Sequence, residues 1–315
     1  MASDFSKWSE RELIFNISEI FAEANSKVSE VLVGIGDDAA VIERPEAQVV
    51  VTTDMAVEDV HFKIKWSSAN EIGRKVAAAN LADIFAMGGK PKYLTVAMAA
   101  TGREDLEWML DVARGIALEA RAAGAQVIGG DLARSEKIVI SITAMGECVK
   151  PILRSGAQIG DSIYISKIPG WSAAGLIALQ NKNHGDLIDL AISEHRVPTI
   201  NYVSAAEIAI GANSLCDISD SLIIQAEQMS EASGVQFVIE GDLITALPEF
   251  AKLLQVAKQL NVSVFDLILS GGEDHAFLAT GRALNGLEIG KVVAGSGIRL
   301  SHLETPQPGW QHFSK

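Results

Sequence analysis

The chain is poor in cysteine, in aromatic residues and in long apolar runs. Among its 315 residues are two cysteines, Cys148 and Cys216, which lie far apart. Two cysteines exclude a four-cysteine zinc site and argue against a disulfide framework. No apolar run reaches the roughly 20 residues that span a bilayer, and the polar start MASDFSKWSE lacks the apolar segment of a signal peptide. These absences predict a soluble cytoplasmic protein.

Basic residues are also scarce. The chain has 40 acidic and 26 basic residues, and its formal net charge is -14. This excess of acid argues against sequence-independent binding to nucleic acid, which needs a basic surface. It does not exclude phosphate ligands, because bound metal cations can invert the charge of an acidic site.

The common nucleotide-binding motifs are missing as well. The sequence contains no G-x-x-x-x-G-K-[ST] motif, no G-x-G-x-x-G after a strand and no protein-kinase motif set. A P-loop enzyme and a dinucleotide-binding dehydrogenase are therefore disfavoured.

Apolar residues make up 48% of the chain, enough to bury a sizeable core. Helix and strand patterns alternate, and the pattern restarts near Lys150-Pro151, which predicts two α/β domains, residues 1–149 and 150–315. The expected helices are 7–24, 69–87, 104–123, 171–181, 203–212, 221–233, 250–260 and 262–269. The expected strands are 47–54, 93–99, 126–131, 138–148, one after the loop that starts at 154, then 236–240, 276–280 and 291–294.

Acidic residues recur at strand ends and in turns rich in glycine, serine and threonine. They are Asp37, Asp38, Asp54, Asp131, Asp217, Asp220, Glu273 and Asp274. A single acidic residue in such a turn usually serves only to stabilise the turn, but the repetition of the pattern favours a shared function.

Asp83 stands apart from these acids, because it lies in the apolar, small-residue helix A-A-A-N-L-A-D-I-F-A. A buried carboxylate is costly unless it is paired, protonated or bound to a cation. Asn80, three residues earlier, shares its face of the helix. Carboxylates with nearby hydroxyls, and without a His/Cys cluster, suit magnesium better than zinc. The chemistry that this favours is metal-assisted phosphoryl transfer.

Taken together, the motifs resemble one family. They are G-I-G-D-D-A-A-V-I, T-T-D-M-A-V-E-D-V-H-F, N-L-A-D-I-F-A-M-G-G-K-P, I-G-G-D, R-S-G-A-Q-I-G-D, D-I-S-D-S and L-S-G-G-E-D, in order from residue 34 to 274, with G-W-Q-H-F near the end. The ordered set resembles thiamine-monophosphate kinase, of the aminoimidazole-ribonucleotide-synthetase-like superfamily.

The resemblance implies a two-domain PurM-like α/β (α+β) fold and a homodimer formed through the N-terminal mixed sheets. The implied reaction converts ATP and thiamine monophosphate to ADP and thiamine diphosphate. In the family the phosphoryl group passes directly to the acceptor, with several Mg²⁺ ions and no phospho-enzyme.

The resemblance also assigns roles to individual residues. The implied metal ligands are Asp38, Thr52, Thr53, Asp54, Asp83, Asp131, Asp217 and Asp220, of which Asp38, Asp83, Asp131 and Asp217 would be catalytic. The implied ATP-binding residues are Gly130, Asp131, Arg154 and Ser219. The implied substrate-binding residues are His61, Glu273 and Trp310.

The chain departs from the family pattern at three places. Ser221 stands where glycine is usual, L-I-I-Q lacks an acid that is common in that helix, and His275-Ala276 replaces a frequent Tyr-Glu. Two alternatives therefore stay open. One is another ATP enzyme of the same superfamily, and the other is a non-catalytic nucleotide-binding regulator on this fold.

Overall fold

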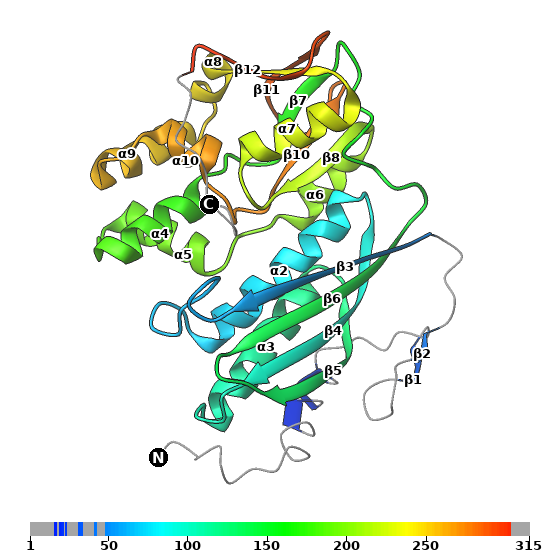
Figure 1. Ribbon diagram of the computed structural model, residues 1–315, viewed down its shortest axis with the longest axis vertical. Coiled ribbons are helices and arrows are strands. Elements are labelled where there is room, and N and C mark those ends of the chain that lie inside the picture. Colours follow the sequence, from blue (N-terminus) through cyan, green and yellow to red (C-terminus); the bar gives the residue numbers. More distant parts are fainter. Residues whose placement is uncertain are drawn as a thin grey trace. The chain divides into compact units, whose positions relative to one another are not determined.

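The chain divides into two compact units in the computed structural model (Figure 1), which describes residues 16–17, 19–21, 23, 31–33, 41–42 and 48–303. One unit comprises 1–84 and 89–149, and the other comprises 85–88 and 150–315. Asp37, Asp38, Trp310 and most of the helix expected at 7–24 lie outside the described residues. No helix in the described ranges is both long and apolar enough to cross a membrane.

The N-terminal unit contains a four-stranded sheet with the order β3-β6-β4-β5. The strands are β3 (Gln48–Val57), β4 (Lys90–Ala100), β5 (Gln126–Arg134) and β6 (Val139–Cys148). β4 and β5 are parallel, and the other neighbours are antiparallel. The short strands β1 (Val31–Val33) and β2 (Val41–Ile42) form a separate pair.

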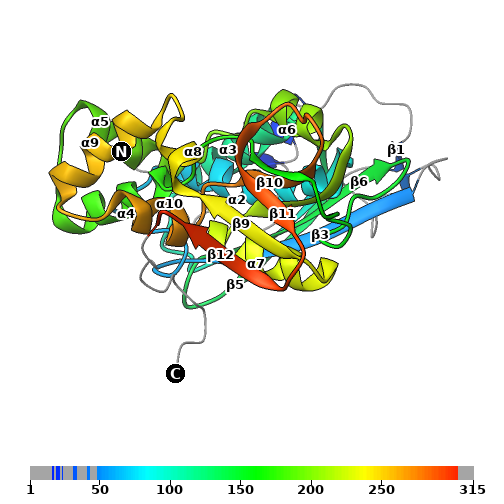
Figure 2. The same ribbon diagram turned by 90° about the horizontal axis from the view of Figure 1, so that it is seen from above.

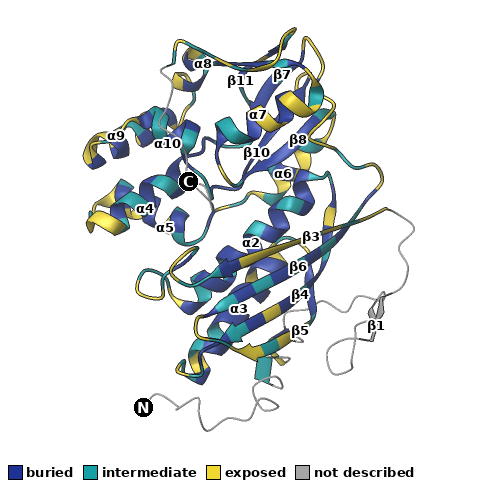
Figure 3. Ribbon diagram, in the orientation of Figure 1, coloured by how far each residue is buried: buried dark blue, intermediate teal, exposed yellow. Residues whose placement is uncertain are grey.

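Two helices, α2 (Ala69–Ala86) and α3 (Leu106–Ala122), cover one face of this sheet. Along β6 buried residues alternate with half-buried ones, so that Ile140 and Ile142 face the core. Ser68 and Glu71 start α2 as a capping box, in which Ser68 N donates to Glu71 Oε2 and Glu71 N donates to Ser68 Oγ. Figure 3 shows β3 as largely exposed and α2 as largely buried.

Glycine lets α2 and α3 cross in backbone contact. A Cβ atom on Gly115 would lie 2.1 Å from the carbonyl oxygen of Asn70, and one on Gly73 would lie 2.1 Å from that of Val112. No larger residue fits at either position unless the helices separate.

The C-terminal unit contains a six-stranded sheet with the order β12-β9-β11-β7-β10-β8 (Figure 2). The strands are β7 (Ser162–Ile165), β8 (Ala212–Ile218), β9 (Gln236–Glu240), β10 (Ala276–Gly281), β11 (Leu287–Val293) and β12 (Gly297–Ser301). β12 is parallel to β9, and the remaining pairs are antiparallel.

Seven helices of this unit lie among the described residues. They are α4 (Trp171–Asn181), α5 (Asp186–Arg196), α6 (Tyr202–Ala209), α7 (Leu222–Ser233), α8 (Gly241–Thr245), α9 (Phe250–Leu260) and α10 (Val264–Ser270). The apolar faces of all of these helices except α6 share one core with the sheet, in which Phe237, Leu253 and Leu278 are fully buried.

Most expected elements are present, but six were missed and one helix ends early. The expected helices at 171–181 and 250–260 match α4 and α9. The sequence did not predict β1, β2, α5, β8, α8 or β12. The helix expected at 203–212 stops at Ala209, because Gly211 adopts a φ of 82° and Ala212 begins β8. β8 has few β-branched residues, and its pairing with β10 makes it a strand.

We expect Gly115→Ala to lower the free energy of unfolding by about 1–3 kcal/mol, because the added methyl group would meet the Asn70 carbonyl. Thermal unfolding followed by circular dichroism measures this. Gly129→Ala is the control, since its Cβ atom would make only an ordinary contact at 3.8 Å to Thr95 Cγ2. Equal melting temperatures for the two variants would contradict the close helix crossing.

Candidate functional site

In the N-terminal unit, polar side chains of α2 meet strand β3. Thr52 Oγ1 donates to Asp83 Oδ2 at 2.7 Å, and the backbone N of Asp54 donates to Asn80 Oδ1 at 2.9 Å. Asn80 is fully buried, and its Nδ2 donates to the Val76 carbonyl. The helix therefore brings Asp83 to the same stretch of strand as Thr52 and Asp54. We call these four residues, Thr52, Asp54, Asn80 and Asp83, the β3–α2 cluster.

Thr53 points to the opposite face of the sheet. Its Oγ1 lies 3.1 Å from Thr143 Oγ1 and donates to the Ile142 carbonyl at 3.0 Å. Because side chains alternate along a strand, the hydroxyl of Thr53 is separated from Asp83 by the sheet. Only its backbone lies beside the β3–α2 cluster.

Asp131 lies on the far edge strand, β5, and is exposed. The strand order puts β5 three strand spacings from β3, roughly 14 Å. Asp131 pairs with Ala97, on the same face as Ser141. The fold of the single unit therefore does not bring Asp131 to the β3–α2 cluster.

Gly130 is a structural requirement of the β4–β5 pairing. A Cβ atom on Gly130 would lie 2.1 Å from the Val96 carbonyl oxygen. Only glycine allows this approach of the two backbones.

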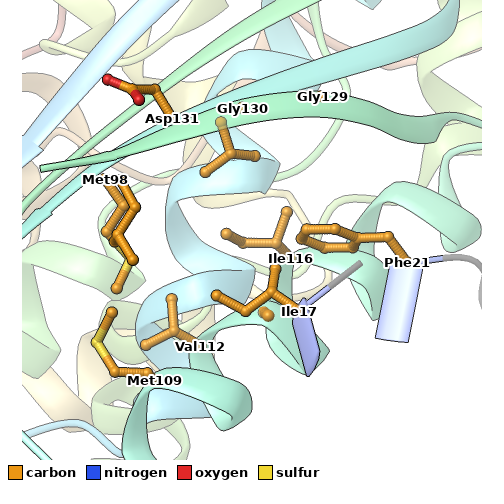
Figure 4. Close-up of a pocket in the computed structure, with 12 residues that line it drawn as sticks. Ile17, Phe21, Met98, Met109, Val112, Ile116, Gly129, Gly130 and Asp131 are labelled. Carbon is orange, nitrogen blue, oxygen red and sulfur yellow. The ribbon is translucent and has the colours of Figure 1, made fainter. Parts of the chain in front are cut away.

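An apolar cavity of about 120 Å³ lies beside this glycine (Figure 4). It is lined by Ile17, Phe21, Val96, Met98, Met109, Val112, Ala113, Ile116, Gly129, Gly130, Asp131 and Leu132. Figure 4 shows the Asp131 carboxylate on the other side of the strand from Met109, Val112 and Ile116. The cavity therefore offers an apolar surface, while the Asp131 carboxylate points away from it.

His61 is held in the turn that follows β3. Its Nδ1 accepts a hydrogen bond from the backbone N of Val57 at 3.0 Å, and its own N donates to the Val57 carbonyl. An accepting Nδ1 leaves the proton of the neutral ring on Nε2. The imidazole is thus arranged to present an N–H donor.

In the C-terminal unit, two predicted motifs lie side by side. The backbone N of Glu273 donates to the Ser219 carbonyl at 2.6 Å, and that of His275 donates to the Ile218 carbonyl at 3.2 Å. A Cβ atom on Gly272 would lie 2.3 Å from the Asp220 carbonyl oxygen. L-S-G-G-E-D therefore lies against D-I-S-D-S, and glycine allows that contact.

This loop has an unusual backbone, fixed by a buried carboxylate. Glu273 and His275 have φ values of 62° and 47°, in the left-handed region, which costs roughly 1–3 kcal/mol per residue. Between them, Asp274 is 1% exposed and accepts from Gly170 N at 2.8 Å and Ser172 N at 3.0 Å. Burial raises the pKa of Asp274, while Lys167 and the two N–H groups oppose that shift.

Asp217 is the most buried of the predicted metal ligands that the structure describes. It is 3% exposed, and its Oδ2 lies 3.2 Å from Nδ1 of His275. His275, which departs from the family pattern, is therefore the partner of this carboxylate.

The other departures also have structural roles. Ser221 caps α7, since its Oγ accepts from Ile224 N at 3.2 Å. Gln225 is 1% exposed, its Oε1 accepts from Arg154 Nη1 at 2.5 Å, and its Nε2 lies 3.4 Å from Ser219 Oγ. Gln225 thus holds Arg154 and Ser219 together, and sequence reasoning missed this residue. The sequence feature that could have revealed Gln225 is an amide in the otherwise apolar stretch L-I-I-Q. Asn80 is likewise an amide in an apolar helix.

Carboxylate, amide and hydroxyl oxygens dominate both groups of residues, and hard divalent cations prefer such donors. Among the described residues, no group of three or more His, Cys, Asp and Glu side chains is close enough to hold a metal ion. The donor chemistry fits magnesium, whose shell is usually completed by water and phosphate.

Comparison with known proteins decides the family. Residues 36–148 match the family described as AIR synthase related protein, N-terminal domain. The thiamine-monophosphate kinase of Mycobacterium tuberculosis (strain CDC 1551 / Oshkosh) is 35% identical over 309 residues, covering 96% of this chain and 92% of the relative. The chain belongs to the thiamine-monophosphate kinase family. The thiamine-monophosphate kinase of Corynebacterium glutamicum is 33% identical, covering 88% of both chains.

A solved structure extends the family match to the fold. AaThiL complexed with AMPPCP and TMP has a TM-score of 0.79 and 28% identity to this chain, with 98% of both chains covered. The two-domain PurM-like α/β fold predicted from the sequence is thereby confirmed, and so is membership of a family of kinases. The roles of individual residues stay predictions.

We expect Asp274→Ala to destabilise the protein by about 1–3 kcal/mol, because it leaves the N–H groups of Gly170 and Ser172 buried without their acceptor. Asp274→Asn keeps one acceptor oxygen and should lose less. Chemical denaturation of both variants measures the difference. Wild-type stability of Asp274→Ala would show that this carboxylate does not fix the loop.

Proposed function

We propose that this chain transfers the γ-phosphoryl group of ATP to thiamine monophosphate, giving ADP and thiamine diphosphate. The observation that carries the proposal is the full-length similarity to AaThiL, a protein solved with AMPPCP and TMP. The retained acids Asp54, Asp83, Asp131, Asp217 and Asp220 support it, since a non-catalytic relative would not need them all.

Magnesium is the proposed metal, and two acidic groups of residues would hold it. In the N-terminal unit these are Asp83, with Thr52, Thr53, Asp54 and Asp38, while Asp131, on the far edge strand β5, is proposed as a separate metal ligand. In the C-terminal unit they are Asp217 and Asp220. Bound Mg²⁺ neutralises the charge of two polyanionic reactants that otherwise repel each other. The hydrogen bond from Thr52 fixes the rotamer of Asp83, so one carboxylate oxygen is already oriented.

The acceptor needs no strong general base, because its phosphate oxygen is already anionic. We propose a direct, in-line transfer in which the residues act by holding the reactants in position. His61 would donate Nε2–H to the acceptor phosphate, consistent with its Nδ1 accepting from Val57 N. Glu273 and Trp310 would contact the thiamine part.

ATP is the proposed donor, and four residues are assigned to it. Arg154 and Ser219, joined through Gln225, would bind its phosphates. Gly130 and Asp131 lie at the apolar cavity, which is suited to the purine ring. In this scheme residues 1–149 form the ATP- and metal-binding domain, and 150–315 form the second PurM-like domain.

A homodimer and a cytoplasmic location complete the proposal. The sheet face of the N-terminal unit opposite α2 and α3 exposes Val49, Val51 and Met55 at 54–59%, a feature typical of interaction surfaces. We place the enzyme in the cytoplasm because ATP is its proposed donor.

The first experiment is formation of thiamine diphosphate from ATP, Mg²⁺ and thiamine monophosphate, measured by chromatography. We expect product, and we expect EDTA to abolish it because the carboxylates act through the metal. Nucleotide binding without product would instead favour a regulator or another ATP enzyme of the superfamily.

Asp83→Asn should lower kcat by at least about 100-fold, because a neutral amide lacks the negative charge with which the carboxylate would bind Mg²⁺. Its melting temperature should stay near that of the wild type, since Asn can still accept from Thr52. Asp111→Asn, a change of the same kind on exposed α3 surface, is the matched control. Turnover of Asp83→Asn equal to that of the control would refute the metal role.

Light scattering should give the mass of a dimer. Val51→Glu should shift it to a monomer, because it places charge on the apolar sheet face. Leu118→Glu, on the exposed side of α3 at 52% exposure, is the control. A monomeric wild type at micromolar concentration, or dimers for both variants, would contradict an interface on this face.

A further inference from the structure

Gln225 is a buried amide on the side of α7 that packs into the core. Its side chain is 1% exposed, and its neighbours on the helix, Leu222 and Met229, are fully buried apolar residues. A buried amide is costly unless its polar atoms are hydrogen-bonded. The two side chains that satisfy it are Arg154 and Ser219, both of which are assigned to the ATP phosphates.

The chemistry of arginine fixes how this amide is oriented. A guanidinium has only N–H donors, so Gln225 turns Oε1 toward Arg154, whose Nη1 lies 2.5 Å away. Its Nε2 then faces Ser219 and donates to Oγ at 3.4 Å. Because Ser219 Oγ accepts this bond, its own hydrogen is available to donate to a further acceptor. The amide therefore sets the direction of the hydrogen bonds as well as the positions of the groups.

The guanidinium of Arg154 is held through one of its nitrogens. Nη1 donates to Oε1 of Gln225 and also to Oε1 of Gln228, one turn further along α7. These bonds use both hydrogens of Nη1, so a phosphate would be bound through the edge formed by Nε and Nη2. Parallel N–H bonds from such an edge are the usual way in which arginine binds phosphate.

The backbone that carries Arg154 is fixed between β8 and α7. The carbonyl of Leu153 accepts from Leu215 N at 3.1 Å, and Ser233 Oγ accepts from Gly156 N at 3.2 Å. Arg154 itself is exposed, so its long side chain would otherwise sample many rotamers. The contacts with the two glutamines restrict that side chain as well.

A carboxylate in place of this amide would serve a phosphate less well. Asp217 and Asp220 already flank Ser219 in D-I-S-D-S, so a further negative charge would repel an anionic ligand. A carboxylate also accepts hydrogen bonds only. It would take the hydrogen of Ser219 and would neutralise the charge of Arg154, whereas the neutral amide does neither.

We propose that Gln225 is a positioning residue for the donor nucleotide. It acts through Arg154 and Ser219, orienting the N–H groups of one and the O–H group of the other toward the phosphates without cancelling positive charge. The identity of the nucleotide as ATP rests on the proposed function.

Calorimetric titration with AMPPCP and Mg²⁺ tests this role. Gln225→Ala should weaken AMPPCP binding at least about tenfold, because Arg154 and Ser219 lose their shared partner. Gln225→Glu should weaken it at least about tenfold as well, although it keeps the shape of the side chain and an acceptor for Arg154. Gln255→Ala and Gln255→Glu, at an exposed position of α9, are the matched controls and should bind AMPPCP as the wild type does.

Gln225→Glu also guards against misfolding, because it changes neither the size nor the shape of the buried side chain. Melting curves show which variants are folded. If a folded Gln225→Glu bound AMPPCP as tightly as the wild type, the amide would serve only to fill space, and the proposal would be overturned.

A double-mutant cycle separates positioning from a general effect on the fold. In an Arg154→Ala background the main group through which Gln225 acts is gone, so Gln225→Ala should weaken AMPPCP binding by less than about threefold further. An equal loss in both backgrounds would overturn the proposal, since Gln225 would then act independently of Arg154. Wild-type AMPPCP binding by Arg154→Ala would overturn it too.

Kinetics separate this inference from the proposed function. Where thiamine diphosphate forms, Gln225→Ala should raise the KM for ATP at least about tenfold and leave that for thiamine monophosphate within about twofold. A selective rise in the KM for thiamine monophosphate would overturn the inference. If the wild type makes no thiamine diphosphate, the loss of AMPPCP binding in both Gln225 variants still supports the positioning role, and only the proposed function is rejected. Product formation with AMPPCP binding unaffected in both variants would keep the function and reject the positioning role.

Discussion

The buried carboxylate of Asp274 is the interaction on which the C-terminal half of the site depends. It accepts two backbone N–H groups at the start of α4, and thereby ties the S-G-G-E-D loop to a helix of the core. Its neighbours Glu273 and His275 are held in left-handed backbone conformations, which persist only where the surroundings fix them. One carboxylate thus fixes where the side chains of Glu273 and His275 project. The same contact occupies the N-terminus of α4, so phosphate must bind elsewhere.

A second constraint is that an acidic chain is proposed to act on two polyanions. The structure meets it with oxygen donors whose positions are set before any ligand arrives. Thr52 orients Asp83, Asn80 binds the backbone of Asp54, and His275 contacts Asp217. Preorganised donors of this kind cost little rearrangement when a cation binds. Asp83, which has no evident partner in the sequence, has Thr52 from a strand 31 residues away.

Local pattern predicted most of the fold, and motif order predicted the family. Helices α4 and α9 have the bounds expected from the sequence, although neither has a side-chain hydrogen bond at its N-cap. β8 was missed because a short strand with few β-branched residues is defined by its partner, β10. The departures Ser221, Gln225 and His275 were visible as substitutions, but their roles as a helix cap, a link between Arg154 and Ser219, and a partner of Asp217 come from contacts across long stretches of chain.

The sequence by itself determined the family, and it predicted the acids of the candidate site. Both inferences depend on residue types and on short spacings between residues, which can be read directly from the sequence. Only the tertiary structure decided which of those residues meet. Strand alternation separates the side chain of Thr53 from that of Thr52, and strand order sends Asp131 to the far edge of the sheet. The cavity of the C-terminal unit that Trp171, Leu190 and Ser204 line exists only because helices and strands distant in sequence pack together. The side of the sheet on which a residue lies, the order of the strands and the walls of a cavity are all properties of three-dimensional packing. No local sequence pattern encodes them.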